Sequence, residues 1–290
     1  MLSYIAITPA RNEADNLRRL ASCMIDQTNA AQGWIIVDNG STDETPAVAR
    51  RLADEHPWIT LVEIPGLAVP TRGAPVVRAF HAGLSTFDDE PDVVVKLDAD
   101  VSFDEHHFAK LIHAFDQDAR LGIAGGTSYE RQHDGSWKRD LLTGDHVRGS
   151  VRAYRWECLE QVTPLEEHMG WDGIDELKAQ VRGWRTLTVP DLAYRHHRIM
   201  GSRESSSVRW SREGDLSHYM GYRFSYLLVR TAYHLRRDPK ALAMLVGFVV
   251  AVLRREPRCP DEAAIAHLRR QQSLPELPSR VREKLGLTTI

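Results

Sequence analysis

Two aspartates, Asp98 and Asp100, follow a short run of β-branched residues and are separated by one small residue. The run begins after Pro91 and is continuously apolar over residues 93–95, which predicts a strand buried on both faces, as in a parallel sheet. Ligands of open α/β sheets gather beyond the carboxyl ends of the strands, where both aspartates would lie. Alternate residues of a strand point to one side, so the two carboxylates should converge. Carboxylates that close repel each other and favour Mg²⁺ or Mn²⁺ bridging a phosphate, although an isolated pair is more often an exposed turn.

Strands and helices alternate in the first half of the chain and would position this pair. Besides the run before Asp98, strands are expected at residues 4–8, 34–37 and 58–64, with helices at 13–24, 74–84 and 105–115. A further helix should follow residues 39–43, where Ser41 or Thr42 can serve as N-cap and Asp43 and Glu44 fill the first turn. The alternation predicts a mostly parallel central sheet with right-handed crossovers, flanked by helices.

The pattern changes after residue 121. Strands are expected at 122–127, 147–154, 185–189 and 192–196, a loop or hairpin at 132–143, and a helix at 174–182 that ends at Gly183. Residues 201–207 favour a linker, and three helical stretches follow at 219–236, 240–255 and 261–271. We therefore expect residues 1–200 to form an α/β domain and residues 201–290 a helical appendage.

Composition excludes several classes of protein. With 290 residues and a formal net charge of −3, the chain has room for a full core and no electrostatic bias toward nucleic acid. Cys23, Cys158 and Cys259 lie far apart and form no CxxC pair, so neither a disulfide framework nor a zinc site is indicated. No signal peptide is evident, and no apolar run reaches the ~18 residues of a membrane span. A reducing cytoplasm is the expected location.

Two other polar segments follow predicted strands. Residues 8–13, Thr-Pro-Ala-Arg-Asn-Glu, place backbone amides and Arg11 at a helix N-terminus, which favours anions. Residues 37–43, Val-Asp-Asn-Gly-Ser-Thr-Asp, put Asp38 at the end of the neighbouring strand, where a carboxylate can accept from a base N–H or a ribose hydroxyl. Taken singly, each segment is also an ordinary strand-to-helix turn.

Together with Lys-Leu-Asp-Ala-Asp at 96–100, these segments form an ordered set that resembles the family 2 glycosyltransferases, over roughly residues 3–198. The resemblance implies the nucleotide-sugar-binding GT-A fold, which is Rossmann-like, with a nucleotide-sugar half at about 1–120 and an acceptor half at about 121–200. It also implies that Asp98 and Asp100 hold a divalent cation on the diphosphate. The implied nucleotide-binding residues are Pro9, Ala10, Arg11, Glu13, Asp38 and Asp98.

A basic segment at 72–78 extends the resemblance. In the family, a basic residue and a glycine precede a helix that carries a second arginine, which places Arg72 and Arg78 near the phosphates or the base. The family usually has Asn after the second arginine, whereas this chain has Ala79. Both arginines remain equally compatible with solvated charges.

The resemblance also assigns residues to the sugar and acceptor side. Gly149 would let a sugar approach the backbone closely, and Arg152 and Trp171 would lie beside it. Residues 170–176 occupy the place of the family's Glu-Asp motif, in which the aspartate is the general base. Trp171 replaces the glutamate here, and a gap-free count from Gly183 assigns the base to Asp172, whereas a one-residue gap would favour Asp175.

The segment at 194–198, Tyr-Arg-His-His-Arg, lies at the end of the last predicted strand. A histidine near this point often completes the metal shell in the family, so His196 or His197 is the expected ligand. The two adjacent histidines leave open which of them binds.

The expected reaction is an inverting, metal-dependent transfer of a sugar from a nucleotide sugar to a hydroxyl acceptor. UDP-sugars are the default donors, with GDP- or TDP-sugars as alternatives. The acceptor would be a glycan, a glycolipid or a polysaccharide precursor. Two other functions stay open: a sugar nucleotidyltransferase, and a non-catalytic subunit of a polysaccharide assembly complex.

The C-terminal helices mix aromatic residues with arginines, and the stretch at 240–255 is short and apolar with basic ends. One interpretation is a helical hairpin at a membrane interface, with arginines reaching the headgroups, which would place the protein at the inner face of the cell membrane. The other is a helical subdomain that packs on the catalytic domain or on a second subunit of a homo-oligomer.

Overall fold

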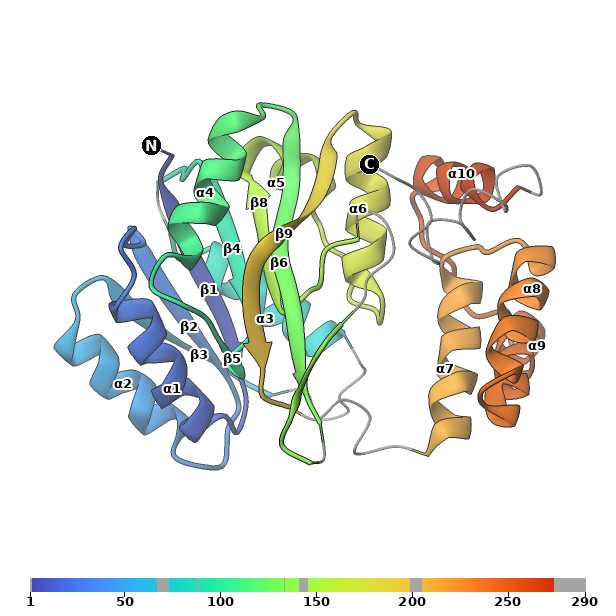
Figure 1. Cartoon of the computed structure of the whole chain (residues 1–290), viewed down its shortest axis with the longest axis horizontal. Helices are drawn as coiled ribbons and strands as arrows, with labels where there is room; N and C mark the ends of the chain where they lie inside the picture. Colours follow the sequence, from blue (N-terminus) through green and yellow to red (C-terminus); the bar gives the residue numbers. More distant parts are fainter. Residues whose placement is uncertain are drawn as a thin grey trace. The chain divides into compact units, whose positions relative to one another are not determined.

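The computed structural model describes residues 2–66, 73–87, 89–132, 134–140, 146–198 and 205–273 (Figure 1). The chain divides into two compact units, Met1–Ile199 and Met200–Ile290. Arg72 and the segment 141–145 lie outside the described residues, so the prediction for Arg72 has no structural counterpart here.

In the first unit, the described strands form one sheet in the order β3-β2-β1-β4-β8-β6-β9-β5, with β7 paired to β6. The strands are β1 (Tyr4–Ala10), β2 (Gly33–Asn39), β3 (Ile59–Ile64), β4 (Val93–Leu97), β5 (Val101–Ser102), β6 (Leu121–Arg131), β7 (Trp137–Arg139), β8 (Val151–Arg155) and β9 (Arg185–His196). The first four strands of the order are parallel, and β8 enters antiparallel between β4 and β6. The predicted mostly parallel α/β sheet is confirmed.

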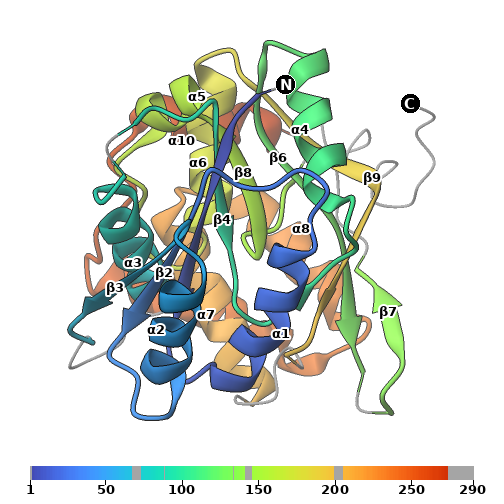
Figure 2. The same ribbon diagram turned by 90° about the vertical axis from the view of Figure 1, so that its left-hand side faces the viewer.

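Helices cover both faces of this sheet because its central strands are apolar on both sides. Tyr4 and Ala6 pack in one cluster with α1 (Ala14–Ile25), α2 (Thr45–Glu55) and α4 (His107–Gln117). Ile5 and Ile7 point to the other face and pack with α3 (Ala74–Leu84), α5 (Trp156–Val162) and α6 (Trp171–Val181). Figure 2 shows α3 and α1 on opposite sides of the strands.

The turn after β2 differs from the prediction. The helix begins at Thr45, whose N–H donates to Asp43 Oδ1 at 2.9 Å, so neither Ser41 nor Thr42 is its N-cap. Both residues bond instead to Asn12, in the turn after β1. The Asn12 N–H donates to Ser41 Oγ at 3.0 Å, and the Thr42 N–H donates to Asn12 Oδ1 at 2.8 Å. Two neighbouring strand-end turns are thereby joined.

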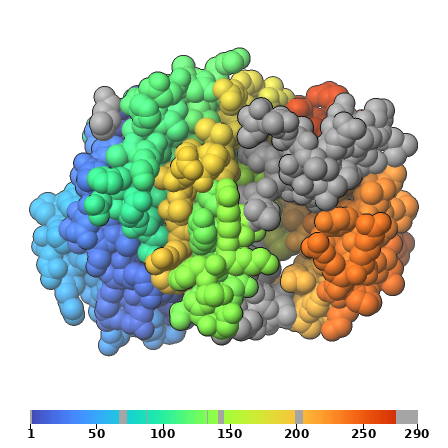
Figure 3. Space-filling model, in the orientation of Figure 1, coloured from blue at the N-terminus to red at the C-terminus, as the bar shows by residue number. Residues whose placement is uncertain are grey.

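Two elements in the second half of the first unit also differ from their predicted bounds. The strands expected at 185–189 and 192–196 are one strand, β9, whose pairing with β6 shifts between Gly126 and Thr127. Helix α6 begins at Trp171, earlier than predicted, after Gly170 in the left-handed conformation with φ 80°. On the face in Figure 3, the gold atoms of β9 lie between those of α4 and the light green atoms of β6 and β7.

The second unit is helical, as predicted for the C-terminal appendage. It contains α7 (Ser206–Tyr219), α8 (Phe224–Leu235), a short 3₁₀ helix η1 (Pro239–Leu242), α9 (Ala243–Leu253) and α10 (Glu262–Gln271). Helix α7 was not predicted, because its serines resemble a linker. Its N-cap Ser205 accepts from the Val208 N–H, which uses the hydroxyl to start the helix.

Candidate active site

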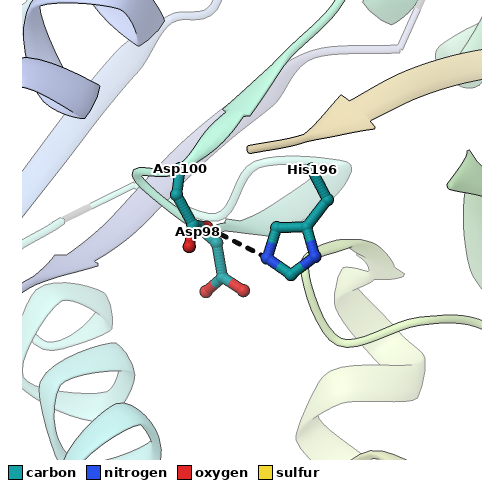
Figure 4. Close-up of side chains that lie close together, drawn as sticks. All are labelled: Asp98, Asp100 and His196. Carbon is teal, nitrogen blue, oxygen red and sulfur yellow. Dashed lines mark ion pairs between the residues drawn. The ribbon is translucent and has the colours of Figure 1, made fainter. Parts of the chain in front are cut away.

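Asp98, Asp100 and His196 come together at the end of β4 (Figure 4). One potential ligand atom of each residue lies within 4.8 Å of the others, and Asp100 Oδ1 is 3.3 Å from His196 Nε2. Strand β4 ends at Leu97, so both aspartates lie in the turn that leads to β5. The carboxylates therefore converge because the chain turns, and not through the strand alternation that we expected.

His196 is positioned by the strands on both sides of β9. It pairs with Val101 of β5 and with Glu130 of β6. The Glu130 carboxylate lies 3.1 Å from His196 Nδ1, which leaves Nε2 directed at Asp100. Burial disfavours the imidazolium, but hydrogen bonds to Asp100 and Glu130 outweigh it and raise the pKa of His196 to about 10. Glu130 orients this histidine, and no motif in the sequence pointed to it.

His197, the other predicted metal ligand, lies outside this group. Its Nε2 is 2.7 Å from Ser102 Oγ, and its ring contacts Trp137 at a centroid distance of 5.1 Å. Strand β9 ends at His196, so His197 follows the strand, and its ring meets Ser102 and Trp137 instead of joining Asp98 and Asp100.

Lys96 is a buried cation that sequence reasoning missed as a site residue. Its Nζ forms an ion pair with Asp98, donates to the Gly149 carbonyl at 2.6 Å, and lies 5.5 Å from the ring centroid of Trp171. Burial raises the pKa of Asp98, Lys96 opposes this shift and Asp100 adds to it. A lysine two residues before an aspartate, within an otherwise apolar strand, was the signal available in the sequence.

Gly149 lies beside Asp98 because β4 and β8 are antiparallel neighbours, and the Asp98 N–H donates to the Ser150 carbonyl at 2.8 Å. A methyl group at Gly149 would lie 3.1 Å from Asp172 Oδ2 and 3.0 Å from the Trp171 ring. Glycine therefore allows the Asp172 carboxylate to approach the backbone at this point. Asp98, Lys96, Gly149 and Asp172 are thus neighbours in one part of the site.

Asp172 lies in the first turn of α6, where the helix N-terminus favours a negative charge. Its side chain is half-buried, and no ion pair to it occurs among the described residues. The neighbouring Trp171 is 7% exposed and packs against Lys96 and Arg152, so most of its ring belongs to the core.

Asp175 and Arg152 form a buried pair behind Asp172. Arg152 Nη2 lies 2.5 Å from Asp175 Oδ1, and the Tyr154 hydroxyl donates to Asp175 at 2.5 Å. Arg152 also donates to Glu176 at 3.1 Å, to the carbonyl of Asp172 at 2.7 Å and to the carbonyl of Val147. Burial raises the pKa of Asp175 to about 7, against the pull of Arg152.

These contacts correct two of our expectations. Arg152 is 0% exposed and all its N–H groups face protein acceptors, so its guanidinium is out of reach of a sugar. Asp175 is 1% exposed and held by Arg152 and Tyr154, which makes it a poor candidate for a base that must meet an acceptor.

The nucleotide-side residues gather at the ends of β1 and β2. Ala10 pairs with Asp38 and Pro9 with Val37 in the parallel register. Asp38 is 4% exposed, and its Oδ2 accepts from the Ser41 N–H at 3.2 Å. Its Oδ1 is buried and has no hydrogen-bond partner within the described segments. Burying an acceptor without a hydrogen bond costs free energy, so this atom is a suitable place for a bound ligand to donate a hydrogen bond.

Charged residues surround this strand end. Arg198 forms an ion pair with Glu13, and its Nε lies 3.0 Å from Asp100 Oδ2, so it links the β1 turn to the aspartate turn. Arg11 is exposed, and a methyl group at Gly66 would lie 3.7 Å from its guanidinium carbon. Arg78 is exposed on α3.

The arrangement has three chemical capacities. Asp38 offers an acceptor, Asp98, Asp100 and His196 offer hard ligands for a divalent cation, and Asp172 offers a carboxylate that can take a proton. The cations Lys96 and Arg198 balance the acidic turn. Such a set suits a substrate that carries a diphosphate and reacts with a hydroxyl group.

Comparisons with solved structures support the fold. A mannosyltransferase from Pyrobaculum calidifontis, in complex with GDP-Man and Mn²⁺, matches with a TM-score of 0.57 at 16% identity, covering 97% of this chain and 84% of that one. S. aureus TarS, residues 1–349, matches with a TM-score of 0.56 at 14% identity, covering 99% and 89%.

Glucosyl-3-phosphoglycerate synthase from Mycobacterium tuberculosis, in complex with Mn²⁺, UDP and glucosyl-3-phosphoglycerate, matches with a TM-score of 0.51 at 16% identity, covering 68% and 72%. No curated protein sequence gives a significant match. The sequence profile of glycosyl transferase family 2 matches residues 5–169, which is more than half of the 290 residues. The chain therefore belongs to glycosyl transferase family 2.

Proposed function

We propose that the protein transfers a sugar from a nucleoside-diphosphate sugar to a hydroxyl acceptor, with inversion at the anomeric carbon. The observation that carries the proposal is the proximity of Asp98 to Asp172: Lys96 pairs with Asp98 and donates to the Gly149 carbonyl, and a methyl group at Gly149 would lie 3.1 Å from Asp172 Oδ2. A cation-binding group and a proton acceptor in one site are what transfer to a hydroxyl requires.

Two carboxylates and an imidazole suit Mg²⁺ or Mn²⁺, which Asp98, Asp100 and His196 would hold. When bound, the cation would neutralise charge that develops on the departing diphosphate. The solved neighbours with GDP-Man and Mn²⁺, or with UDP and Mn²⁺, support this choice of cofactor and donor class.

The chain's own residues would act as follows. The Oδ1 of Asp38 would accept from the nucleoside, and Pro9, Ala10, Arg11 and Glu13 would contact the nucleotide at the end of β1. Asp172 would take the proton of the acceptor hydroxyl, on the side of the sugar opposite the leaving group. A UDP-sugar is the first donor to test, and the acceptor class is a glycan, a glycolipid or a polysaccharide precursor.

The test is nucleotide release from a panel of UDP-, GDP- and TDP-sugars with and without Mn²⁺. Nucleoside diphosphate release that depends on Mn²⁺ supports transfer. Pyrophosphate formation would instead identify a nucleotidyltransferase. If no nucleotide is released with any donor and candidate acceptor, the protein is a non-catalytic subunit.

Asp100→Ala should lower metal-dependent nucleotide affinity by at least about tenfold in calorimetry, because it removes a proposed ligand. Asp104→Asn is the matched control, since that side chain is 57% exposed, pairs loosely with Lys110 at 3.4 Å, and keeps as asparagine the oxygen that accepts from the His106 N–H. Unchanged metal-dependent affinity in Asp100→Ala would remove Asp100 from the metal site.

A further inference from the structure

The second unit has an apolar surface on α8 and α9, which lie side by side (Figure 1). Twelve large hydrophobic side chains are exposed among the described residues, and eleven of them lie between residues 208 and 253. On α9 and the residue before it, they include Leu242, Val246, Val249 and Leu253, with Leu253 76% exposed. We call the exposed hydrophobic side chains of α8 and α9, together with Leu242, the apolar face.

Helix α9 is apolar all round. Its sequence, Ala-Met-Leu-Val-Gly-Phe-Val-Val-Ala-Val-Leu, contains no polar residue. One side, with Met244, Gly247 and Phe248, is buried, and a methyl group at Gly247 would overlap the Ser211 carbonyl of α7. The spacing of Leu242, Val246 and Leu253 places them on the opposite side, where a water-exposed helix is normally polar.

Basic residues border the apolar face. Lys240 precedes α9, and Arg254, Arg255 and Arg258 follow it, all of them exposed. The whole segment 200–290 carries 16 Lys and Arg against nine Asp and Glu, a net charge of +7, whereas residues 1–199 carry 21 against 31, a net charge of −10. Positive charge and exposed apolar surface therefore concentrate in the same unit.

We propose that this surface docks on the headgroup region of an anionic phospholipid bilayer. Lipid acyl chains would accept the apolar face, and the phosphates would meet the basic residues at both ends of α9. A helix of eleven residues is about 16 Å long, about half the hydrocarbon thickness of a bilayer. No described helix is both long and apolar enough to cross a membrane, so the helix would lie in the interface.

A second copy of the chain is the less favoured occupant. An antiparallel pairing of two α9 helices would bring Lys240 of one copy near Arg254 and Arg255 of the other, and like charges at an interface are costly. Anionic headgroups supply the opposite charge instead.

The experiment is co-sedimentation of the full chain with vesicles of equimolar phosphatidylcholine and phosphatidylglycerol, compared with phosphatidylcholine alone. The protein should bind the anionic vesicles and dissociate with added salt. Val246→Glu should lower the partition coefficient by at least about tenfold, because it places a charge in the apolar face. Ile25→Glu is the matched control, since Ile25 is 43% exposed in the first unit and should retain binding.

The double variant Arg254→Glu/Arg255→Glu leaves the apolar face intact and should also lose binding to anionic vesicles by at least about tenfold. Circular dichroism checks that each variant is folded. Absence of binding to anionic vesicles overturns the proposal, as does full retention in both the Val246 and the double arginine variants. If the protein does not bind vesicles but forms a dimer, and Val246→Glu dissociates this dimer, the apolar face belongs to an interface with a second copy. The apolar face and its basic residues lie within residues 224–258, whereas the proposed donor-site residues lie within residues 9–198. A negative result for vesicle binding therefore leaves the proposed sugar transfer untouched, and the reverse also holds.

Discussion

At the scale of single residues, burial separates two aspartates that the sequence left as alternatives. Asp172 and Asp175 lie one helical turn apart on α6, and both have the carboxyl group that a base needs. Asp175 is locked between Arg152 and Tyr154, whereas the carboxylate of Asp172 reaches Gly149 beside Lys96. The proton acceptor proposed for the transfer is therefore Asp172.

Asp172→Asn should lower turnover by about a thousandfold while donor affinity stays unchanged, because only the proton acceptor is lost. Steady-state kinetics and calorimetry with the donor measure the two effects. Glu167→Gln, which changes an exposed carboxylate nearby, should behave like the unmodified enzyme. Retained turnover in Asp172→Asn would move the base to another residue.

Lys96 shows how one buried charge can serve both halves of the site. It holds Asp98 by an ion pair and the Gly149 carbonyl by a hydrogen bond, so it fixes the acceptor-side backbone against the acidic turn. Its positive charge also competes with any cation that Asp98 binds.

We expect Lys96→Met to bind Mn²⁺ at least about tenfold more tightly, because a repelling charge next to Asp98 is removed. Turnover should fall, since the Gly149 segment loses its anchor. Calorimetric titration with Mn²⁺ measures the affinity, and Lys110→Met, which changes a half-exposed lysine on α4, is the control. Weaker Mn²⁺ binding in Lys96→Met would mean that the ion pair instead holds Asp98 in its binding geometry.

At the scale of elements, the antiparallel strand β8 joins the two halves of the site. It sets Gly149 and Ser150 against β4, and its buried Arg152 holds the first turn of α6 through the Asp172 carbonyl. A guanidinium with all its N–H groups occupied fixes the helix start in one position. We therefore expect Arg152 to position Asp172 without touching substrate.

Arg152→Met should lower the free energy of unfolding by about 3–5 kcal/mol, because Asp175 and Glu176 lose their buried partner. The loss should grow as the pH rises. Without Arg152, the folded-state pKa of Asp175 would rise further above its value in the unfolded chain. A protein whose buried carboxyl has a raised pKa loses free energy of unfolding as the pH rises from the unfolded-state pKa to the folded-state pKa.

Urea unfolding of Arg152→Met at pH 6 and pH 8.5 measures this trend. The double variant Arg152→Met/Asp175→Asn cannot ionise at position 175, so it should recover part of the stability and lose most of the pH dependence. A pH-independent loss in the single variant would show that the pair is not the source of the effect.

At the scale of the whole molecule, the proposed active site and the proposed membrane-binding surface belong to different units of the chain. Every proposed donor-site residue lies in the unit Met1–Ile199, which has its own core on both faces of the sheet. The unit Met200–Ile290 has a separate small core around Trp210, Leu227 and Met244.

A fragment of residues 1–199 should therefore fold and bind UDP with Mn²⁺ within about threefold of the affinity of the full chain, since this unit has its own core and holds every proposed donor-site residue. It should lose vesicle binding. Calorimetry and co-sedimentation test both statements. A fragment that folds but does not bind nucleotide would show that the second unit contributes to the donor site.

The sequence by itself determined the fold class and the motifs, because these depend on local pattern. Alternating apolar strands and helices predict a parallel sheet, and polar residues after each strand predict where ligands gather. Hence the strand ends at Ala10, Asn39 and Leu97 were expected near their observed places. The family resemblance carried by the same segments is confirmed by the profile match.

The tertiary structure decided which members of each ambiguous pair share the site. His196 rather than His197 faces Asp100 because β9 lies between β5 and β6, and Asp175 is buried because Arg152 of β8 reaches it. Glu130, Lys96 and Arg198 were missed as site residues for the same reason: their partners lie in other elements or across a turn. Local sequence fixes which side of an element a residue occupies, whereas the partner that meets it depends on how distant elements pack.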